Sequence, residues 1–430
     1  IAFKLPNLFR RITAEGALTS VFLPIYSKLK TQNGEVLAFI YFKKVLYRVV
    51  FSLFILMIIF QIIMPFIIHF LAPGFLNNQN VVEQTTTLSR ITIIFMPLIS
   101  IVAILGVATN VSGKFWVLAF TPTILNTSII LGCFFINDYW TIKSLPLAIA
   151  TVFGGLIQII FILIMIKKFK IFNFKNLEKK RSDRNINKQI QFQLSQTWKK
   201  FLPAAFGGGI LQINLLVDTI LASLLGFGSI SYLYFADRIA QLPLGIIGIA
   251  LGTTLLTSLS KSIASKDTNQ FSKELIISLK IGLFFSIPAA LVFINFSDLL
   301  IKVLFERGEF SFQETIQTSH ALLAYAFGVP AFIMLKSCQP AFLAEGNTKT
   351  PMYIGFVILI LNIILSFSLM FFLKHAGIAL ATSIVSWIGT IIYITLLIKA
   401  KKIIKPKFSL TEDDSNLFSV ILYGLKITLI

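Results

Sequence analysis

Residues 49–70 read VVFSLFILMIIFQIIMPFIIHF, an apolar run that contains no Asp, Glu, Lys or Arg. An α-helix of about 20 such residues crosses the hydrocarbon core of a bilayer, which is roughly 30 Å thick. A second run of this kind extends from Gly355 to Leu373. The run therefore predicts a membrane-spanning helix, and its recurrence along the chain predicts an integral membrane protein.

The composition agrees with a membrane protein and argues against an enzyme. Of 430 residues, 56% are hydrophobic and 13% are charged, whereas soluble domains have about 25% charged residues. Cys133 and Cys338 lie far apart in apolar stretches, which does not indicate a disulfide framework. The sequence has no G-x-x-x-x-G-K-[ST] phosphate loop, and His69, His320 and His375 lack metal-ligand spacing. We therefore expect no catalytic residues, no firm metal site and no cofactor.

Apolar segments recur along the whole chain, and we expect about twelve spans in an all-α integral membrane fold. They cover 1–29, 39–71, 86–110, 116–136, 144–169, 200–225, 229–259, 274–297, 315–343, 352–373, 376–398 and the start of one at 417–430. The chain begins at Ile1 and stops at Ile430 inside apolar segments. We therefore expect both ends to be truncated.

Lys and Arg alternate between the loops. Loops such as 167–200 and 399–407 are basic, whereas 72–85 and 225–230 contain neither Lys nor Arg. The positive-inside rule assigns the basic loops to the cytoplasm. This distribution explains the net charge of +20 without a nucleic-acid partner, and it predicts that the first span runs inwards.

A basic polar segment, residues 171–199, divides the chain. We interpret it as a solvated cytoplasmic linker near anionic headgroups, with a regulatory or partner-binding role as the alternative. The linker separates an N-terminal lobe, 1–170, from a C-terminal lobe, 200–402. Residues 403–430 are then a loop and the truncated start of a further helix.

The two lobes share a weak internal repeat. At offsets of 233, 236 and 231 residues, matches occur between Leu23-Pro-Ile-Tyr-Ser-Lys28 and Leu256-Thr-Ser-Leu-Ser-Lys261, between Leu125-Asn126 and Leu361-Asn362, and between Ala148-Ile-Ala-Thr151 and Ala379-Leu-Ala-Thr382. Matching loops fall on the same side of the membrane, so the repeat is parallel. Two parallel halves are a transporter architecture, and they predict a substrate site between the halves.

The first span is unusual because it carries several ionic residues, which in a membrane helix are costly and usually face a protein cavity. Arg11 and Glu15 are four residues apart and can neutralise each other. Arg10 has no acid three or four residues away. It therefore needs a partner from elsewhere. This partner is either a ligand or, in the structural alternative, the membrane interface that the side chain reaches or a residue of another helix.

Arg238 repeats this pattern in the second half. Its neighbour Asp237 points elsewhere on a helix, and no acid lies three or four residues from Arg238. Each half thus contributes one arginine, and two forked guanidiniums suit a phosphate or pyrophosphate. Asp218 is a lone carboxylate among aliphatic residues. It is a candidate for binding a proton or a cation, with a structural carboxylate as the alternative.

Several motifs resemble one known family. Residues Phe3-Lys-Leu-Pro-Asn-Leu-Phe-Arg-Arg-Ile-Thr-Ala-Glu-Gly-Ala17, followed by Phe22-Leu-Pro24, closely resemble the second helix of the MurJ (MviN) lipid II flippases. Also similar are Ala72-Pro-Gly-Phe75, Tyr234-Phe-Ala-Asp-Arg238, Pro243-Leu-Gly245, Ala250-Leu-Gly-Thr253 and Leu259-Ser-Lys261. The resemblance covers essentially the whole chain in order.

The resemblance implies a fold and a function. Members have fourteen helices, arranged as two six-helix lobes of the MOP superfamily (MATE-like) plus two C-terminal helices, so this chain would lack the first helix and most of the last two. They move lipid II, the undecaprenyl-pyrophosphate peptidoglycan precursor, from the cytoplasmic to the periplasmic leaflet by alternating access. We expect a multi-pass inner-membrane monomer that binds lipid II and membrane lipids, with another MOP exporter, for drugs or polysaccharide-lipid intermediates, as the alternative.

The resemblance also implies roles for individual residues. The pyrophosphate would be held by Arg10, Arg238, Lys4 and Asn7. Some members bind sodium through a pattern that is matched here by Asp218, Asn362 and Thr382. Ser366 replaces an acidic ligand of that pattern, and Gln241 stands where some members carry Glu. Coupling to sodium and coupling to the membrane potential alone therefore both stay open.

Overall fold

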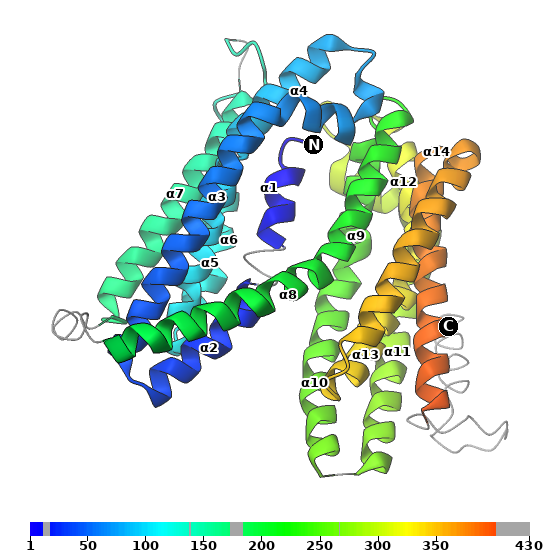
Figure 1. Ribbon diagram of the computed structural model, residues 1–430. Coiled ribbons are helices and arrows are strands. Elements are labelled where there is room, and N and C mark those ends of the chain that lie inside the picture. Colours follow the sequence, from blue (N-terminus) through cyan, green and yellow to red (C-terminus); the bar gives the residue numbers. More distant parts are fainter. Residues whose placement is uncertain (12–17, 137–138, 173–183, 266, 401–430) are drawn as a thin grey trace. The chain divides into compact units, whose positions relative to one another are not determined.

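The computed structural model describes residues 1–11, 18–136, 139–172, 184–265 and 267–400, and all regular elements in these ranges are helical (Figure 1). The predicted all-α class is confirmed. Contacts divide the chain into two compact units, Ile1–Gln212 and Ile213–Ile430.

The first unit is built around one buried helix. Its elements are α1 (Lys4–Phe9), α2 (Leu18–Gln32), α3 (Glu35–Leu71), η2 (Pro73–Phe75), α4 (Gln79–Thr92), α5 (Phe95–Val111), α6 (Phe115–Cys133), α7 (Leu145–Lys168) and the first part of α8 (Arg184–Leu224). Helix α5 is buried along most of its length and packs against α2, α3, α6 and α7. Small residues permit this packing: Gly154 faces α6, and a side chain on Gly155 would lie 2.8 Å from the ring of Phe95.

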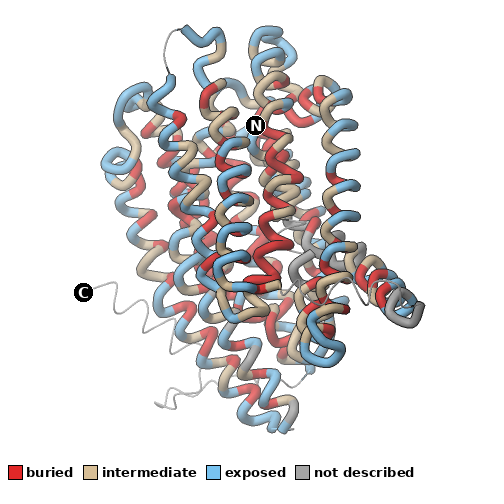
Figure 2. Tube along the Cα trace, turned by 90° about the vertical axis from the view of Figure 1, so that its left-hand side faces the viewer, coloured by how far each residue is buried: buried red, intermediate tan, exposed pale blue. Residues whose placement is uncertain are grey.

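The outer surface of α3 is as apolar as its inner one. Ile62, Phe66 and Phe70 are 70%, 77% and 72% exposed, and their spacing places them along one side of the helix. In the burial view, exposed and buried positions alternate along such helices (Figure 2). An exposed stripe of this size would be unfavourable in water, so it is the surface that contacts lipid.

The second unit has a similar order of elements. They are the end of α8, α9 (Ser229–Pro243), the π-helical turn η4 (Leu244–Gly248), α10 (Ile249–Ala264), α11 (Thr268–Phe305), α12 (Phe312–Ala326), α13 (Val329–Ala344) and α14 (Lys349–Lys399). Helix α14 is broken at Lys374, where φ is 51° and ψ is −135°. This break falls between the predicted spans 352–373 and 376–398. Gly377 permits the sharp return, because a side chain there would collide with the main-chain carbonyl of Leu369.

A second break separates α12 from α13, which are bent by 43°. A helix break leaves main-chain carbonyls without helical partners, and in a membrane these must be satisfied by protein. The second half of α14 supplies donors, from Ser383 to the carbonyl of Ala324 (2.8 Å), from Trp387 to Phe327 (2.8 Å) and from Thr390 to Ala331 (3.2 Å). The three donors recur at helical spacing, so one face of α14 stabilises the bend.

The order of helices repeats between the units. Each contains two consecutive helices (α1 and α2; α9 and α10), a helix of 37 or 38 residues with an internal proline (α3; α11), two further consecutive helices (α4 and α5; α12 and α13), and two apolar helical segments (α6 and α7; the two halves of α14). The described residues contain seven helices apolar and long enough to cross a membrane, or eight when α12 and α13 count as one span. The figure of twelve spans stays a prediction, and its last segment, 417–430, lies outside the described residues. Helix α8 begins at Arg184, so residues 184–199 of the predicted linker are helical.

Candidate functional site

Helix α1 carries Lys4, Asn7 and Arg10 and is held against the rest of the first unit by contacts at both ends. The hydroxyl of Thr92 on α4 donates to the carbonyl of Ala2 across 2.6 Å. At the other end, the rings of Phe9 and Phe60 on α3 lie 5.3 Å apart between centroids. These contacts fix a helix of only six residues that would not be stable by itself.

Arg10 caps the C-terminal end of α1, and its side chain is oriented by Asn7. The Nε atom of Arg10 donates to the Oδ1 atom of Asn7 across 2.8 Å. Both side chains are half-buried, as is that of Lys4 one turn earlier. The predicted group of Lys4, Asn7 and Arg10 therefore shares one short helix. The proposed partner of Arg11, Glu15, lies outside the described residues.

Arg238 is oriented by an aromatic ring on the exposed side of α9. Its guanidinium carbon lies 4.7 Å from the centroid of the Tyr234 ring, a distance typical of a cation–π contact. The adjacent carboxylate of Asp237 accepts a hydrogen bond from Gln241 across 2.5 Å. No hydrogen bond or ion pair joins Arg238 to another described residue. Among the described residues, the ring of Tyr234 is therefore the contact that orients Arg238.

The two arginines are held in comparable ways. Each contacts a side chain on the preceding turn of its helix, Asn7 for Arg10 and Tyr234 for Arg238. Neither Asn7 nor Tyr234 supplies a negative charge at neutral pH. The two contacts therefore orient the guanidiniums, as a phosphate-binding arginine requires.

A polar cluster lies inside the second unit and joins α8 to both halves of α14. The Nδ2 atom of Asn362 donates to Oδ1 of Asn214 across 2.8 Å and to Oδ1 of Asp218 across 2.9 Å. The hydroxyl of Thr382 donates to Oδ1 of Asn362 across 3.4 Å. Asn362 is only 1% exposed. The structure thus brings together the three residues predicted as a cation site, Asp218, Asn362 and Thr382.

The donor set of this cluster is suited to a hard cation. Asn214, Asp218, Asn362 and Thr382 all present side-chain oxygens, the ligand type that such cations prefer. Ser366, one turn after Asn362, is fully buried, and its hydroxyl has no hydrogen-bond partner among the described residues. A buried hydroxyl in this state is a further oxygen available to a ligand, so the residues fit a sodium ion.

Two residues near these positions were missed by sequence reasoning. Asn214 had no signal beyond its place one turn before Asp218. Lys336 did have one, because a lone lysine inside an apolar helix is a functional candidate by default. The Cγ atom of Lys336 lies close to the position that a Cβ atom on Gly248 would occupy. The main-chain carbonyl oxygen of Lys336 lies 3.2 Å from the position that a Cβ atom on Gly252 would occupy. Both glycines thus allow Lys336 of α13 to approach closely.

Comparisons with known proteins agree on one family. The family model described as "Lipid II flippase MurJ" matches residues 1–430. The chain is 37% identical over 392 residues to a probable lipid II flippase MurJ of Rickettsia prowazekii (strain Madrid E), covering 90% of this chain and 74% of that protein. It is 32% identical over 430 residues to a probable lipid II flippase MurJ of Buchnera aphidicola subsp. Acyrthosiphon pisum (strain APS), covering 100% and 81%.

Solved structures show the same likeness. A lipid II flippase MurJ in an inward closed conformation superposes with a TM-score of 0.78 at 27% identity, covering 100% of this chain and 84% of that one. An inward-facing multidrug resistance MATE family transporter of the MOP superfamily gives a TM-score of 0.65 at 13% identity, covering 94% and 96%. The second match shows a shared fold alone.

Proposed function

The chain belongs to the MurJ family of lipid II flippases, and from this premise we propose that Arg10 and Arg238 bind the pyrophosphate of the lipid II that it transports. As a member, the chain is a lipid II flippase of the bacterial inner membrane, a multi-pass transporter and not an enzyme. Lys4 and Asn7 belong to the same proposal, since they share α1 with Arg10.

The environment of Arg238 is the observation that carries this proposal. An arginine inside an apolar helix is costly unless it faces a cavity, a counter-ion or water. Arg238 is exposed on the surface of its unit and has only the ring of Tyr234 as a described partner. A pyrophosphate supplies two negatively charged groups that accept paired hydrogen bonds from a guanidinium. Its binding would offset the cost of placing this cation in the membrane.

The repeated order of elements supports a transport cycle by alternating access. Transporters built from two parallel repeats move a substrate by rocking one bundle against the other. Each repeat here carries one of the two arginines at its first described helix, Arg10 at the end of α1 and Arg238 within α9. We propose that a monomer completes this cycle, because each unit has a buried core of its own.

Asp218, Asn362 and Thr382 are proposed to hold a sodium ion that couples to the cycle. When bound, the ion supplies a positive charge that compensates the carboxylate of Asp218. Asn362 donates a hydrogen bond to Asp218 from a different helix, so it orients the carboxylate whether or not the ion is bound. Replacing sodium by potassium should slow translocation in the wild type and leave an Asp218→Asn variant unaffected. Equal rates in both salts for the wild type would mean that the membrane potential alone drives the cycle.

The pyrophosphate proposal is tested by removing each guanidinium. Arg10→Ala and Arg238→Ala should each abolish translocation of lipid II across the membrane of a flippase-depleted bacterium, while the amount of inserted protein is unchanged. Arg307→Ala is the matched control, since Arg307 lies in an exposed loop and, among the described residues, its side chain bonds only the carbonyl of Leu304. Retained translocation in both variants would refute the proposed site. The MATE-like fold alone gives no observation that favours a drug exporter.

A further inference from the structure

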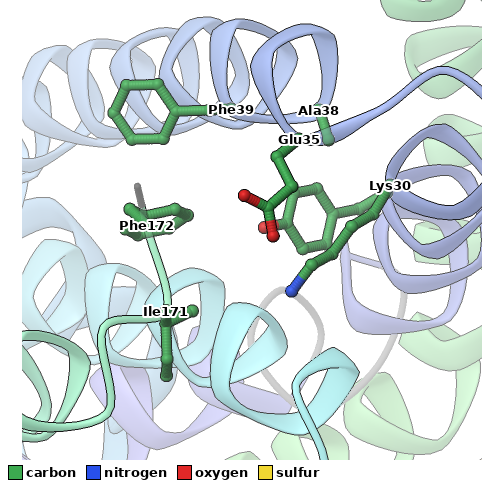
Figure 3. A pocket seen from close by; sticks show the side chains of 7 residues that line it. Lys30, Glu35, Ala38, Phe39, Ile171 and Phe172 are labelled. Carbon is green, nitrogen blue, oxygen red and sulfur yellow. The ribbon is translucent and has the colours of Figure 1, made fainter. Parts of the chain in front are cut away.

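A small pocket opens in the first unit, away from the residues assigned to the pyrophosphate. It lies where α2 ends, α3 begins and the chain leaves α7, and it has about 250 Å³ of empty space including its mouth. Tyr26, Lys30, Glu35, Phe39 and Phe172 line it together with Ala38 and Ile171 (Figure 3). The distribution of Lys and Arg assigns this end of the helices to the cytoplasm, so the pocket lies at the depth of the inner-leaflet headgroups.

Two opposite charges line this pocket without neutralising each other. The ammonium of Lys30 donates to the hydroxyl of Ser112, 82 residues away in sequence, across 2.9 Å. The carboxylate of Glu35 belongs to the first turn of α3 and forms no hydrogen bond or ion pair with another described residue. Figure 3 shows both groups pointing into the same space. The pocket therefore has no net charge but presents a cation and an anion side by side.

A tyrosine hydroxyl opens onto the same pocket. Tyr26 is only 2% exposed, and its ring stacks on Phe22 at 5.6 Å. Its hydroxyl lines the pocket and has no hydrogen-bond partner among the described residues. A ligand with a donor would satisfy this hydroxyl, and the enclosed part of the pocket has room for a group about the size of a water molecule.

Aromatic rings form the remaining wall. The rings of Phe39 and Phe172 meet edge to face at 4.8 Å between centroids, and Phe172 also contacts Phe42 at 5.0 Å. The faces of such rings attract cations. The wall and Glu35 therefore favour an ammonium in this part of the pocket, whereas Lys30 favours an anion at its side.

We propose that this pocket binds the headgroup of a zwitterionic phospholipid with a primary ammonium, that is, a phosphoethanolamine group. The phosphate contacts the ammonium of Lys30. The ligand's ammonium donates to the carboxylate of Glu35 and the hydroxyl of Tyr26, against the rings of Phe39 and Phe172. A trimethylammonium cannot donate these hydrogen bonds and is larger than the enclosed space, so phosphatidylcholine is excluded.

The test measures binding of short-chain lipids to the purified full chain in detergent. Short-chain phosphatidylethanolamine should bind at least about tenfold more tightly than short-chain phosphatidylcholine. Glu35→Gln, Tyr26→Phe and Lys30→Gln should each weaken phosphatidylethanolamine binding by about tenfold, as expected for the loss of one charge-assisted hydrogen bond. Tyr26→Phe keeps the stacked ring. Lys28→Gln is the matched control, because Lys28 is exposed on the same helix and carries the same charge.

Free phosphoethanolamine distinguishes a membrane lipid from a soluble ligand as the occupant of the pocket. Weaker binding of free phosphoethanolamine than of the lipid supports the membrane as the source, and equal binding would show that a soluble ligand occupies the pocket instead. Equal affinity for phosphatidylethanolamine and phosphatidylcholine, or unchanged affinity in the Glu35, Tyr26 and Lys30 variants, would overturn the proposal. None of these residues is assigned to the pyrophosphate, so failure here leaves the flippase proposal intact.

Discussion

Asn362 donates a hydrogen bond to the carboxylate of Asp218 across 2.9 Å and thereby joins two helices that are 144 residues apart in sequence. The same amide nitrogen also contacts Asn214. One side chain on α14 thus satisfies two acceptors on α8. In an apolar environment, such a bond fixes the relative position of both helices, because burying a polar group without its hydrogen bond costs free energy.

A double-mutant cycle should detect this coupling. Asn362→Ala leaves two acceptors without their donor and should lower the free energy of unfolding by about 1–3 kcal/mol. In a protein that already carries Asp218→Ala, Asn362→Ala should lower the free energy of unfolding by less than it does in the wild type. The coupling energy should be about 0.5–3 kcal/mol. Denaturant titration in micelles measures both values. Asn295→Ala is the control, since the exposed Asn295 bonds only the carbonyl of Leu291; strictly additive effects would contradict the coupling.

The aromatic partner of Arg238 should affect transport in a graded way. Tyr234→Phe keeps a ring beneath the guanidinium, so its translocation rate should stay close to that of the wild type. Tyr234→Leu removes the ring and should slow translocation several-fold, since a cation–π contact contributes about 0.5–2 kcal/mol. The exposed Tyr353 of the same unit provides the control substitution Tyr353→Leu. Equal rates for Tyr234→Phe and Tyr234→Leu would show that the ring does not orient Arg238.

The translocation rate should depend on both the charge and the size of the side chain at position 7. Asn7→Ala removes the acceptor of the Arg10 Nε hydrogen bond and should slow translocation about tenfold by releasing the guanidinium. Asn7→Asp keeps an acceptor but adds a negative charge, which would pair with Arg10 and compete with a pyrophosphate. We expect Asn7→Asp to be the slower variant in a lipid II translocation assay. An Asn7→Asp protein as active as the wild type would argue against anion binding at Arg10.

Gly377 should tolerate no side chain. A Cβ atom there would lie 2.6 Å from the main-chain carbonyl carbon of Leu369 and closer still to its oxygen, so Gly377→Ala must displace backbone. We expect a loss of about 1–3 kcal/mol and a lower midpoint of thermal unfolding. Gly209→Ala is the matched control, because nothing lies within 4 Å of its added methyl group and alanine is the better helix former. A Gly377→Ala protein as stable as the wild type would contradict the tight return.

The sequence by itself determined the fold class, the break in α14 and the identity of the candidate residues. Apolar runs such as residues 49–70 require helices in a membrane, because every main-chain polar group must be satisfied within the segment. That no acid lies three or four residues from Arg238 followed from helical spacing alone. These features are local, so they can be predicted from neighbours in the chain.

Only the tertiary structure decided which distant residues meet. The contact of Asn362 with Asp218, the donors from α14 to the bent segment at α12 and the pocket around Tyr26 all join segments that are separated in sequence. Helical spacing fixes which side of a helix a residue occupies but not which helix packs there. That choice depends on close packing at residues such as Gly155 and Gly377, where the absence of a side chain allows one particular neighbour to approach.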